Sequence, residues 1–250
     1  MGALEERKTS DSVPTTTTEI KEGEYPEEFT QLSNTAIIGG ENIRKAFQNY
    51  GLNYNVAPEH EPLKYGLKLE YYVSIIELLV YIWIGMILSK INDITPRRYL
   101  DWVITTTILL VSTSVLLIYE KQKQDGFSEK KTAEEMIIEN KDTLIKISIS
   151  NLLMLLFGFL GETKQINKYT GLVLGMAFFI YGFYTIYDSF AKQSTFGVQF
   201  FTIFTIVWLL YAVAYLMKPI VKNSMYNILD LISKNAFGLY LMYRVYQVSI

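Results

Sequence analysis

The stretch Asn227-Ile-Leu-Asp-Leu-Ile-Ser-Lys-Asn-Ala-Phe-Gly238 places a lysine, Lys234, near the middle of an apolar run from Tyr226 to Tyr246. The run is close to the ~20 residues that a helix needs to cross ~30 Å of hydrocarbon. A charge at that depth costs about 3 kcal/mol on insertion scales, so a buried lysine indicates a function by default. A desolvated amine favours Schiff-base chemistry with a carbonyl compound.

Asp230 precedes Lys234 by four residues, so the two side chains share one face of a helix. The Asp230 carboxylate is therefore within reach of a protonated imine on the lysine. The alternative on spacing alone is an intramembrane Asp–Lys ion pair that holds helices together without any bound carbonyl compound.

Six apolar runs predict an all-α integral membrane protein, a helical bundle with six clear spans. None of the runs alternates an apolar stripe with a charged face, as a helix of a soluble bundle does. We therefore expect a multi-pass protein whose first partner is the lipid bilayer. The runs cover residues 70–89, 99–119, 143–161, 169–187, 197–217 and 226–246.

The first 66 residues differ from the rest of the chain. Residues 1–66 are polar and lack the basic-then-apolar start of a signal peptide. We expect a largely disordered arm with one short amphipathic helix near residues 42–49, followed by a membrane domain over residues 67–250. The loop 120–142 is dense in Lys and Glu, and the positive-inside tendency puts it and both termini in the cytoplasm.

The composition argues against several classes of function. The net charge is −2 without a basic tail, so we expect no nucleic-acid partner. The chain has no cysteine, which removes thiolate nucleophiles and cysteine metal sites. The only histidine, His60, lies in a polar stretch and is expected to be a solvated loop residue. We therefore expect neither an enzyme with catalytic residues nor a metal site.

A second span-borne acid, Asp101, lies in the run Arg98-Tyr-Leu-Asp-Trp-Val-Ile-Thr-Thr-Thr107. Asp101, Thr105 and Ser112 are four and seven residues apart, which places them on one stripe of a helix. A buried carboxylate with hydroxyls on its stripe favours proton acceptance or an ion path. The alternative is that these hydroxyls bond to their own helix backbone, which we prefer for Thr107.

These motifs resemble those of the microbial rhodopsins in order and separation over about residues 68–250. Arg98-Tyr-x-Asp-Trp-x-x-Thr-Thr is similar to the family's third helix, and Asp230-x-x-Ser-Lys234 is similar to its seventh. The resemblance implies all-trans retinal on Lys234 as a Schiff base. The other residues that it assigns to the chromophore are Asp101 and Asp230 as counterions, Arg98 beneath them, and Trp102, Thr105, Thr106, Met154, Trp208 and Tyr211.

The first run, Glu70-Tyr-Tyr-Val-Ser-Ile-Ile-Glu77, resembles the second helix of channelrhodopsins. In those proteins a glutamate joins the asparagine after the retinal lysine in a central gate, and Asn235 supplies that asparagine here. A carboxylate–amide constriction passes cations only when its hydrogen bond is broken. Glu70 would match an inner-gate glutamate, with Arg244 as its partner.

Ser112 disfavours outward proton pumping. The resemblance puts the cytoplasmic proton donor of a pump at position 112, where this chain has a serine. The triplet Asp101, Thr105 and Ser112 is instead similar to the first group of viral rhodopsins. We therefore expect a photoreceptor that is a light-gated channel for monovalent or divalent cations or protons. A light-driven proton pump, a sensory rhodopsin and a membrane protein without retinal stay open, as does a homo-oligomer.

The family has seven spans, whereas this sequence predicts six. The segment 35–51 has too many charges and glycines to cross hydrocarbon as the first helix. A truncated or divergent chain, a partner chain in its place, or an arm packed against the bundle would each account for the difference.

Overall fold

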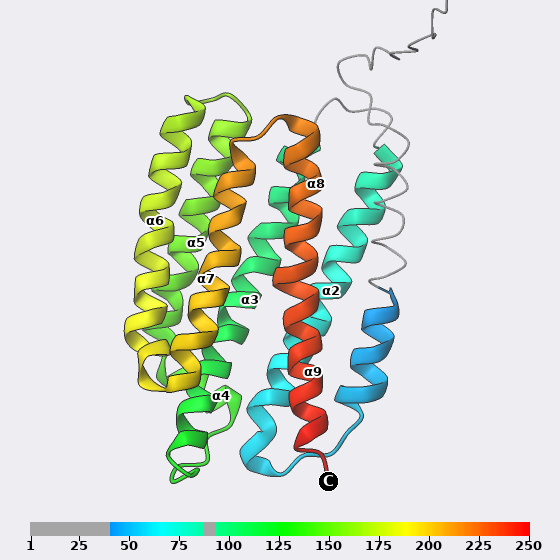
Figure 1. Cartoon of the computed structure of the whole chain (residues 1–250), viewed down its shortest axis with the longest axis vertical. Helices are drawn as coiled ribbons and strands as arrows, with labels where there is room; N and C mark the ends of the chain where they lie inside the picture. The colour runs from blue at the N-terminus through cyan, green and yellow to red at the C-terminus, as the bar shows by residue number, and fades with distance from the viewer. Residues whose placement is uncertain (1–40, 88–93) are drawn as a thin grey trace, which may run out of the picture.

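A computed structural model describes residues 41–87 and 94–250, and in these ranges it forms a bundle of long helices (Figure 1). Residues 41–47 are α-helical and continue into η1 (Gln48–Leu52), and η2 (Pro58–His60) leads into α2 (Glu61–Ile87). The remaining elements are α3 (Thr95–Gln124), α4 (Ala133–Glu139), α5 (Lys141–Glu162), α6 (Lys168–Ser189), η4 (Ala191–Gln193), α7 (Thr195–Tyr215), α8 (Pro219–Asp230), η5 (Leu231–Ala236) and α9 (Phe237–Gln247).

Five stretches of the described residues are long and apolar enough to cross a membrane. They are Pro58–Met86, Thr95–Gln124, Lys141–Glu162, Lys168–Gln193 and Thr195–Tyr215. This finding confirms the prediction of an all-helical, multi-pass membrane protein.

The sixth predicted span, 226–246, corresponds to α8, η5 and α9 in succession. The π-helical turn η5 divides it, so that neither α8 nor α9 alone has the length of a span. A π-turn inside a helix is rare and often marks a functional position. Lys234 lies in this turn.

The helix ends follow local sequence signals. Asn167 caps α6 by accepting hydrogen bonds from the backbone N–H groups of Tyr169 and Thr170. Ser194 caps α7 by accepting one from Gly197. Such caps satisfy N–H groups that have no partner within the helix, so they fix where each span begins.

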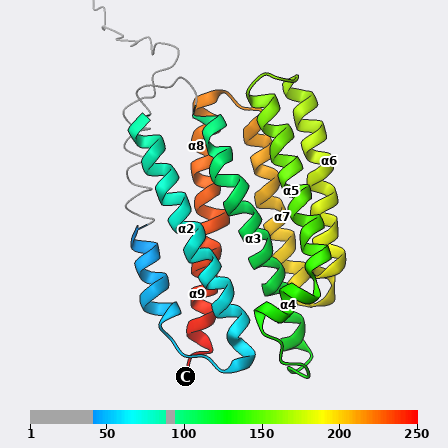
Figure 2. The ribbon, with the colours of Figure 1, turned by 180° about the vertical axis from the view of Figure 1, so that it is seen from behind.

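The first predicted span is longer than expected, because α2 begins at Glu61 rather than at Glu70. Leu63 and Leu67 are fully buried, which explains why the helix extends through a stretch with polar neighbours. Figure 2 shows α2 and α3 side by side. Both therefore border the same part of the interior.

Residues 41–52 are helical and pack against the bundle, beside α2 and α9. Phe47 is buried and contacts Gly238 of α9, where a Cβ would collide with the ring. The expected short helix at residues 42–49 is therefore present, and it packs against α2 and α9. Most of the expected disordered arm, residues 1–40, lies outside the described residues.

Glycines set the spacing between α5 and α6. A Cβ on Gly171 would lie 2.7 Å from the Phe157 carbonyl oxygen, and one on Gly175 would lie 3.2 Å from that of Met154. The two helices therefore approach backbone to backbone, which shapes one wall of the cavity described below.

Candidate functional site

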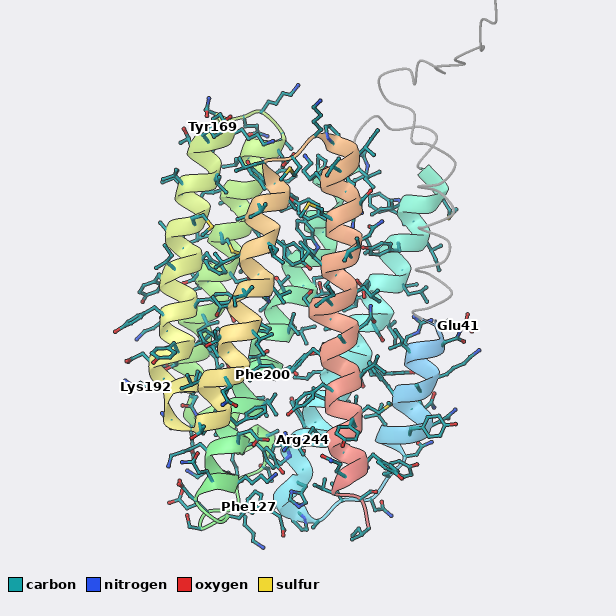
Figure 3. All side chains as sticks on the ribbon, viewed as in Figure 1. Glu41, Phe127, Tyr169, Lys192, Phe200 and Arg244 are labelled. Carbon is teal, nitrogen blue, oxygen red and sulfur yellow. The ribbon has the colours of Figure 1, made fainter. Side chains whose placement is uncertain are left out.

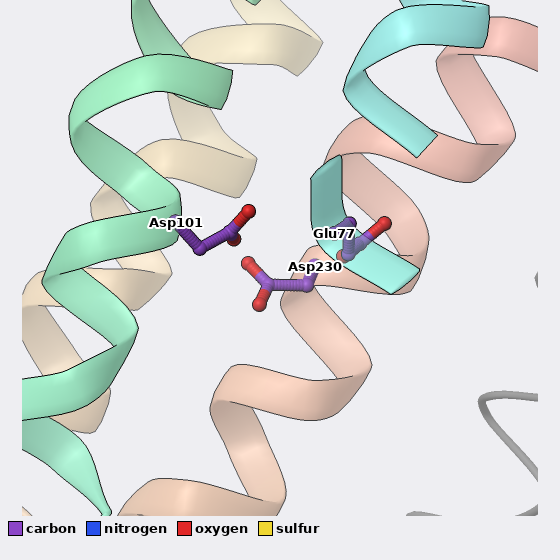
Figure 4. A group of neighbouring side chains, drawn as sticks. All are labelled: Glu77, Asp101 and Asp230. Atoms are coloured by element: carbon purple, nitrogen blue, oxygen red, sulfur yellow. The ribbon is translucent and has the colours of Figure 1, made fainter. Parts of the chain in front are cut away.

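Lys234 is the centre of a buried charged cluster. Its side chain is 1% exposed, and its Nζ lies 2.6 Å from Asp101 Oδ2, 3.5 Å from Glu77 Oε1 and 3.6 Å from Asp230 Oδ1. Figure 4 shows the three carboxylates converging from α3, α2 and α8. Nζ is a free ammonium here, and it stands where an imine nitrogen would lie. The structure thus brings both acids to the lysine, Asp230 as the spacing predicts and Asp101 as the resemblance implies.

Asp230 is buried, and protein side chains donate several hydrogen bonds to it. It accepts hydrogen bonds from Tyr211 Oη at 2.8 Å, Tyr81 Oη at 2.9 Å and Trp102 Nε1 at 3.2 Å. Arg98 Nη1 lies 3.6 Å from its other side. Hydrogen bonds to a charged acceptor are strong, so these contacts hold the Asp230 side chain in place.

Arg98 is almost fully buried, and its guanidinium donates hydrogen bonds to side chains of α8 and α2. Its Nε donates to Asn223 Oδ1 at 3.0 Å, its Nη2 donates to Asn227 Oδ1, and its Nη1 donates to Tyr81 Oη at 2.9 Å. Sequence reasoning missed these three partners. A signal was present, because Asn223 and Asn227 precede Asp230 by seven and three residues and so share its face of α8.

An apolar cavity adjoins the cluster. Trp102 and Tyr211 line it and also donate to Asp230, while Ser233 lines it next to Lys234. The predicted chromophore residues Trp102, Thr106, Met154, Trp208 and Tyr211 all line this cavity. Sequence reasoning missed other lining residues, among them Tyr99, Gly158, Gly171, Gly175, Phe179, Tyr215 and Tyr226.

The cavity fits a long apolar aldehyde attached to the lysine. Ligand pockets are typically apolar and supplied with a few placed polar groups. Here aromatic side chains line the cavity, and the lining residues Trp102 and Tyr211 connect it to Asp230 of the cluster by hydrogen bonds. When bound, retinal would be held by these residues, with Lys234 as its attachment point.

The hydroxyls of α3 mainly bond to their own helix. Thr105, Thr106 and Thr107 each donate to the carbonyl oxygen four residues earlier. Asn151 of α5 adds a contact that was not predicted, since its Nδ2 donates to Thr106 Oγ1 at 2.8 Å and Thr107 Oγ1 at 3.2 Å. Thr105 therefore lies one turn from Asp101 in the expected stripe, with its hydroxyl directed at the backbone.

Glu77 faces Lys234 rather than Asn235. Its Oε1 lies 3.5 Å from Lys234 Nζ, and the Glu77–Asn235 gate contact stays a prediction. The physical reason is that a buried ammonium attracts a carboxylate more strongly than an amide does. Asn235 is the next residue around the helix, and it is buried on another side of the turn.

Glu70 is buried without an ionic partner. Neither of its carboxylate oxygens has a hydrogen-bond partner within the described part of the chain. The predicted partner, Arg244, instead pairs with Glu120 at 2.6 Å. Arg244 lies near the C-terminal end of the bundle, the end that also holds Phe127 (Figure 3). Ser112, fully buried, lies 3.5 Å from the Gly66 carbonyl oxygen.

His60 is half-buried rather than a solvated loop residue. Its Nδ1 is hydrogen-bonded to Tyr119 Oη at 2.9 Å, next to the Glu120–Arg244 pair. Tyr240 accepts a further hydrogen bond from Arg244 at 2.5 Å. These groups close the C-terminal end of the interior between α2, α3 and α9.

A set of polar side chains of α2, α3, α8, η5 and α9, buried except for the half-buried Tyr81, forms what we call the polar seam. It differs from the cavity, which is lined from α3, α5, α6, α7, α8 and η5. Lys234 lies between the two. The seam consists of Glu70, Glu77, Tyr81, Arg98, Asp101, Ser112, Glu120, Asn223, Asn227, Asp230, Lys234, Asn235 and Arg244.

Comparisons with known proteins agree with this fold. The profile of a family described as bacteriorhodopsin-like protein matches residues 43–248. Among solved structures, viral rhodopsin OLPVRII is 24% identical with a TM-score of 0.74, over 90% of this chain and 100% of that chain. No curated protein sequence matches the chain.

Pumps share the same architecture. The proton-pumping rhodopsin AR2 from the marine alga Acetabularia acetabulum is 17% identical with a TM-score of 0.65, over 88% of this chain and 95% of that chain. Halorhodopsin, a light-driven chloride pump, is 11% identical with a TM-score of 0.63, over 87% and 95%. At these identities the likeness shows the fold alone.

Proposed function

Since the chain belongs to the bacteriorhodopsin-like family of retinal-binding membrane photoreceptors, we propose that light opens a cation path through it. The observation that carries this proposal is the polar seam, which runs beside Lys234 from the start of α3 to the end of α9. The proposed output is ion movement rather than an enzymatic reaction, and the proposed partners are the bilayer and the permeating cations or protons.

Retinal, which we propose binds as the all-trans isomer on Lys234, supplies the absorption of light and a change of shape beside that nitrogen. The chain provides the proton chemistry. Asp101 Oδ2, at 2.6 Å, is the nearest acceptor for a proton on Lys234 Nζ. Asp230 is further away and already accepts three hydrogen bonds. Transfer to Asp101 would therefore remove the ion pair that ties α3 to η5.

The charge of the seam favours cations. Five of its residues are acidic, namely Glu70, Glu77, Asp101, Glu120 and Asp230, whereas the basic ones are Arg98, Lys234 and Arg244. A pore lined by an excess of carboxylates attracts cations and repels anions. The same excess argues against chloride transport beside Lys234.

Polar contacts at three positions along the seam would block the ion path in the dark. Arg98 with Asn223 and Asn227 closes the end at which α3 begins, and the Lys234 cluster closes the middle. Arg244 with Glu120 closes the C-terminal end. Each closure joins helices by polar contacts, so a shift of the last span would loosen all of them.

Outward proton pumping is the second candidate, and Glu70 favours it. The serine at position 112 removes the expected donor, but Glu70 is a buried, unpaired acid on the neighbouring helix. Glu70 lies two turns before Glu77 along α2, nearer to the end of the bundle that holds Arg244. From there it could return a proton to Lys234.

Voltage-clamp recording under illumination separates these candidates. We expect photocurrents that reverse sign with applied voltage and shift their reversal potential when external cations are replaced. Currents of one fixed direction would support the pump. No current from a pigment-forming protein would leave a sensory role. Lys234→Ala serves as the control without a light response.

A further inference from the structure

The turn that follows α3 has a strained backbone. Gly126 and Phe127 have φ angles of 67° and 54°, in the left-handed region that a bulky residue such as phenylalanine rarely adopts. A conformation of this kind persists only where the surrounding contacts hold it. The contacts of the Phe127 ring therefore decide whether the turn keeps its place.

His60, the residue before α2, supplies one of these contacts. The Phe127 ring lies edge-on to the His60 ring, with the centroids 5.4 Å apart, and its centroid is 5.8 Å from that of Tyr119. His60 Nδ1 is hydrogen-bonded to Tyr119 Oη at 2.9 Å. The three rings thus join the strained turn to the start of α2 and to the end of α3.

The residues on either side of His60 hold the chain beyond the turn. Glu59 Oε2 lies 3.3 Å from Lys130 Nζ. Glu61 Oε2 accepts a hydrogen bond at 2.8 Å from the backbone N–H of Ala133, the first residue of α4. Residues 125–133 are therefore docked on residues 59–61, and His60 is at the centre of the contact.

A proton on His60 would add a positive charge to a place that already holds several. The acids Glu59 and Glu120 are each paired with another cation, Lys130 and Arg244 respectively. A positive charge is also unfavourable at the N-terminal end of a helix, and α2 begins at the next residue. The titratable groups on the elements around His60 are Glu59, Glu61, Tyr119, Glu120, Lys123, Lys130, Tyr240 and Arg244.

We propose that His60 is a pH-sensitive latch that holds residues 125–133 against the start of α2. Histidine changes its charge between about pH 5 and 8, and His60 is the only histidine of the chain. When His60 takes up a proton in mildly acidic water, repulsion from the nearby cations frees the Phe127 ring, and the strained turn relaxes. The latch rests on contacts within the protein and not on channel activity. In the proposed channel, its release would loosen the neighbouring Glu120–Arg244 closure.

Backbone hydrogen exchange of residues 125–133 tests the latch in the full-length protein in lipid. Exchange is measured between pH 8 and 5 and corrected for the intrinsic effect of pH on its rate. We expect it to become several-fold faster on acidification. His60→Phe keeps an aromatic ring but cannot take up a proton, so this variant should lose the acceleration. Tyr119→Phe, which keeps the histidine, should retain it.

An equal acceleration in His60→Phe would overturn the proposal, as would its absence in the unmodified protein or its loss in Tyr119→Phe. If His60→Phe does not fold, magnetic resonance of the protein labelled with ¹⁵N-histidine follows the single imidazole directly. Equal pH midpoints of imidazole titration and of exchange support the latch, whereas different midpoints overturn it. Missing photocurrents alongside a pH-dependent latch would count against the channel alone.

Discussion

Asp101 Oδ2 lies 2.6 Å from Lys234 Nζ, although 133 residues separate the two in the chain. Asp230, on the same helix as the lysine, is a full ångström further away at 3.6 Å. The contact across helices is therefore the tighter one, and it joins Lys234 Nζ to α3. In the proposed function, this geometry makes Asp101 the nearer proton acceptor of the two acids.

Asp101→Asn should shift the visible band to longer wavelength. The substitution removes the negative charge nearest to Lys234 and so destabilises the positive charge at the nitrogen. It should also slow proton loss from that nitrogen, which flash photolysis measures. An unmoved spectrum would remove Asp101 from the counterion.

Asp230→Asn should destabilise the folded protein more than Asp101→Asn does. It would weaken the three hydrogen bonds that Asp230 accepts and leave the buried Arg98 without its carboxylate. Breaking a buried ion pair by removing one partner costs about 3–5 kcal/mol. The temperature at which the visible band is lost measures this difference, and equal values for the two variants would contradict it.

Glu120→Gln should produce a cation leak in the dark. The variant leaves Arg244 unpaired at the C-terminal closure of the seam. Glu162→Gln is the matched control, because it breaks another buried pair, with Lys222 at 2.5 Å, that joins α5 to α8 outside the seam. Both variants should lose stability, but a dark current in both or in neither would contradict the assigned closure.

Gly171→Ala should lower the free energy of unfolding by about 1–3 kcal/mol, the usual cost of overpacking. The added Cβ would lie 2.7 Å from a backbone oxygen of α5, which cannot move as a side chain can. Gly85→Ala on α2 is the control, since nothing lies within 4 Å of its Cβ. Equal loss of colour on heating in both variants would speak against close packing of α5 on α6.

Much of the site could be predicted because it depends on spacing within single helices. Lys234 and Asp230 are one turn apart, and an isolated charge in an apolar run is conspicuous. The pairing of Glu77 and of Arg244 could not be predicted, because it depends on which helices are neighbours and at what height. Local spacing places Asn223 and Asn227 on the same face of α8 as Asp230, but it does not identify Arg98 of another helix as their partner.

The packing of residues 41–52 could not be predicted for a related reason. The sequence predicts a short helix at residues 42–49, but not that the buried ring of Phe47 packs against the glycine at position 238. A tertiary contact of this kind has no periodic signal in the sequence. The glycines that line the cavity could likewise not be predicted, because their role depends on how closely α5 and α6 pack.

The visible absorption of Lys234→Ala after incubation with all-trans retinal tests the central claim most directly. Lys222→Ala is the matched control, because Lys222 is also a buried, ion-paired lysine of the last span. We predict that the unmodified protein and Lys222→Ala acquire a visible band and that Lys234→Ala stays colourless. A band of normal position and intensity in Lys234→Ala would contradict the account.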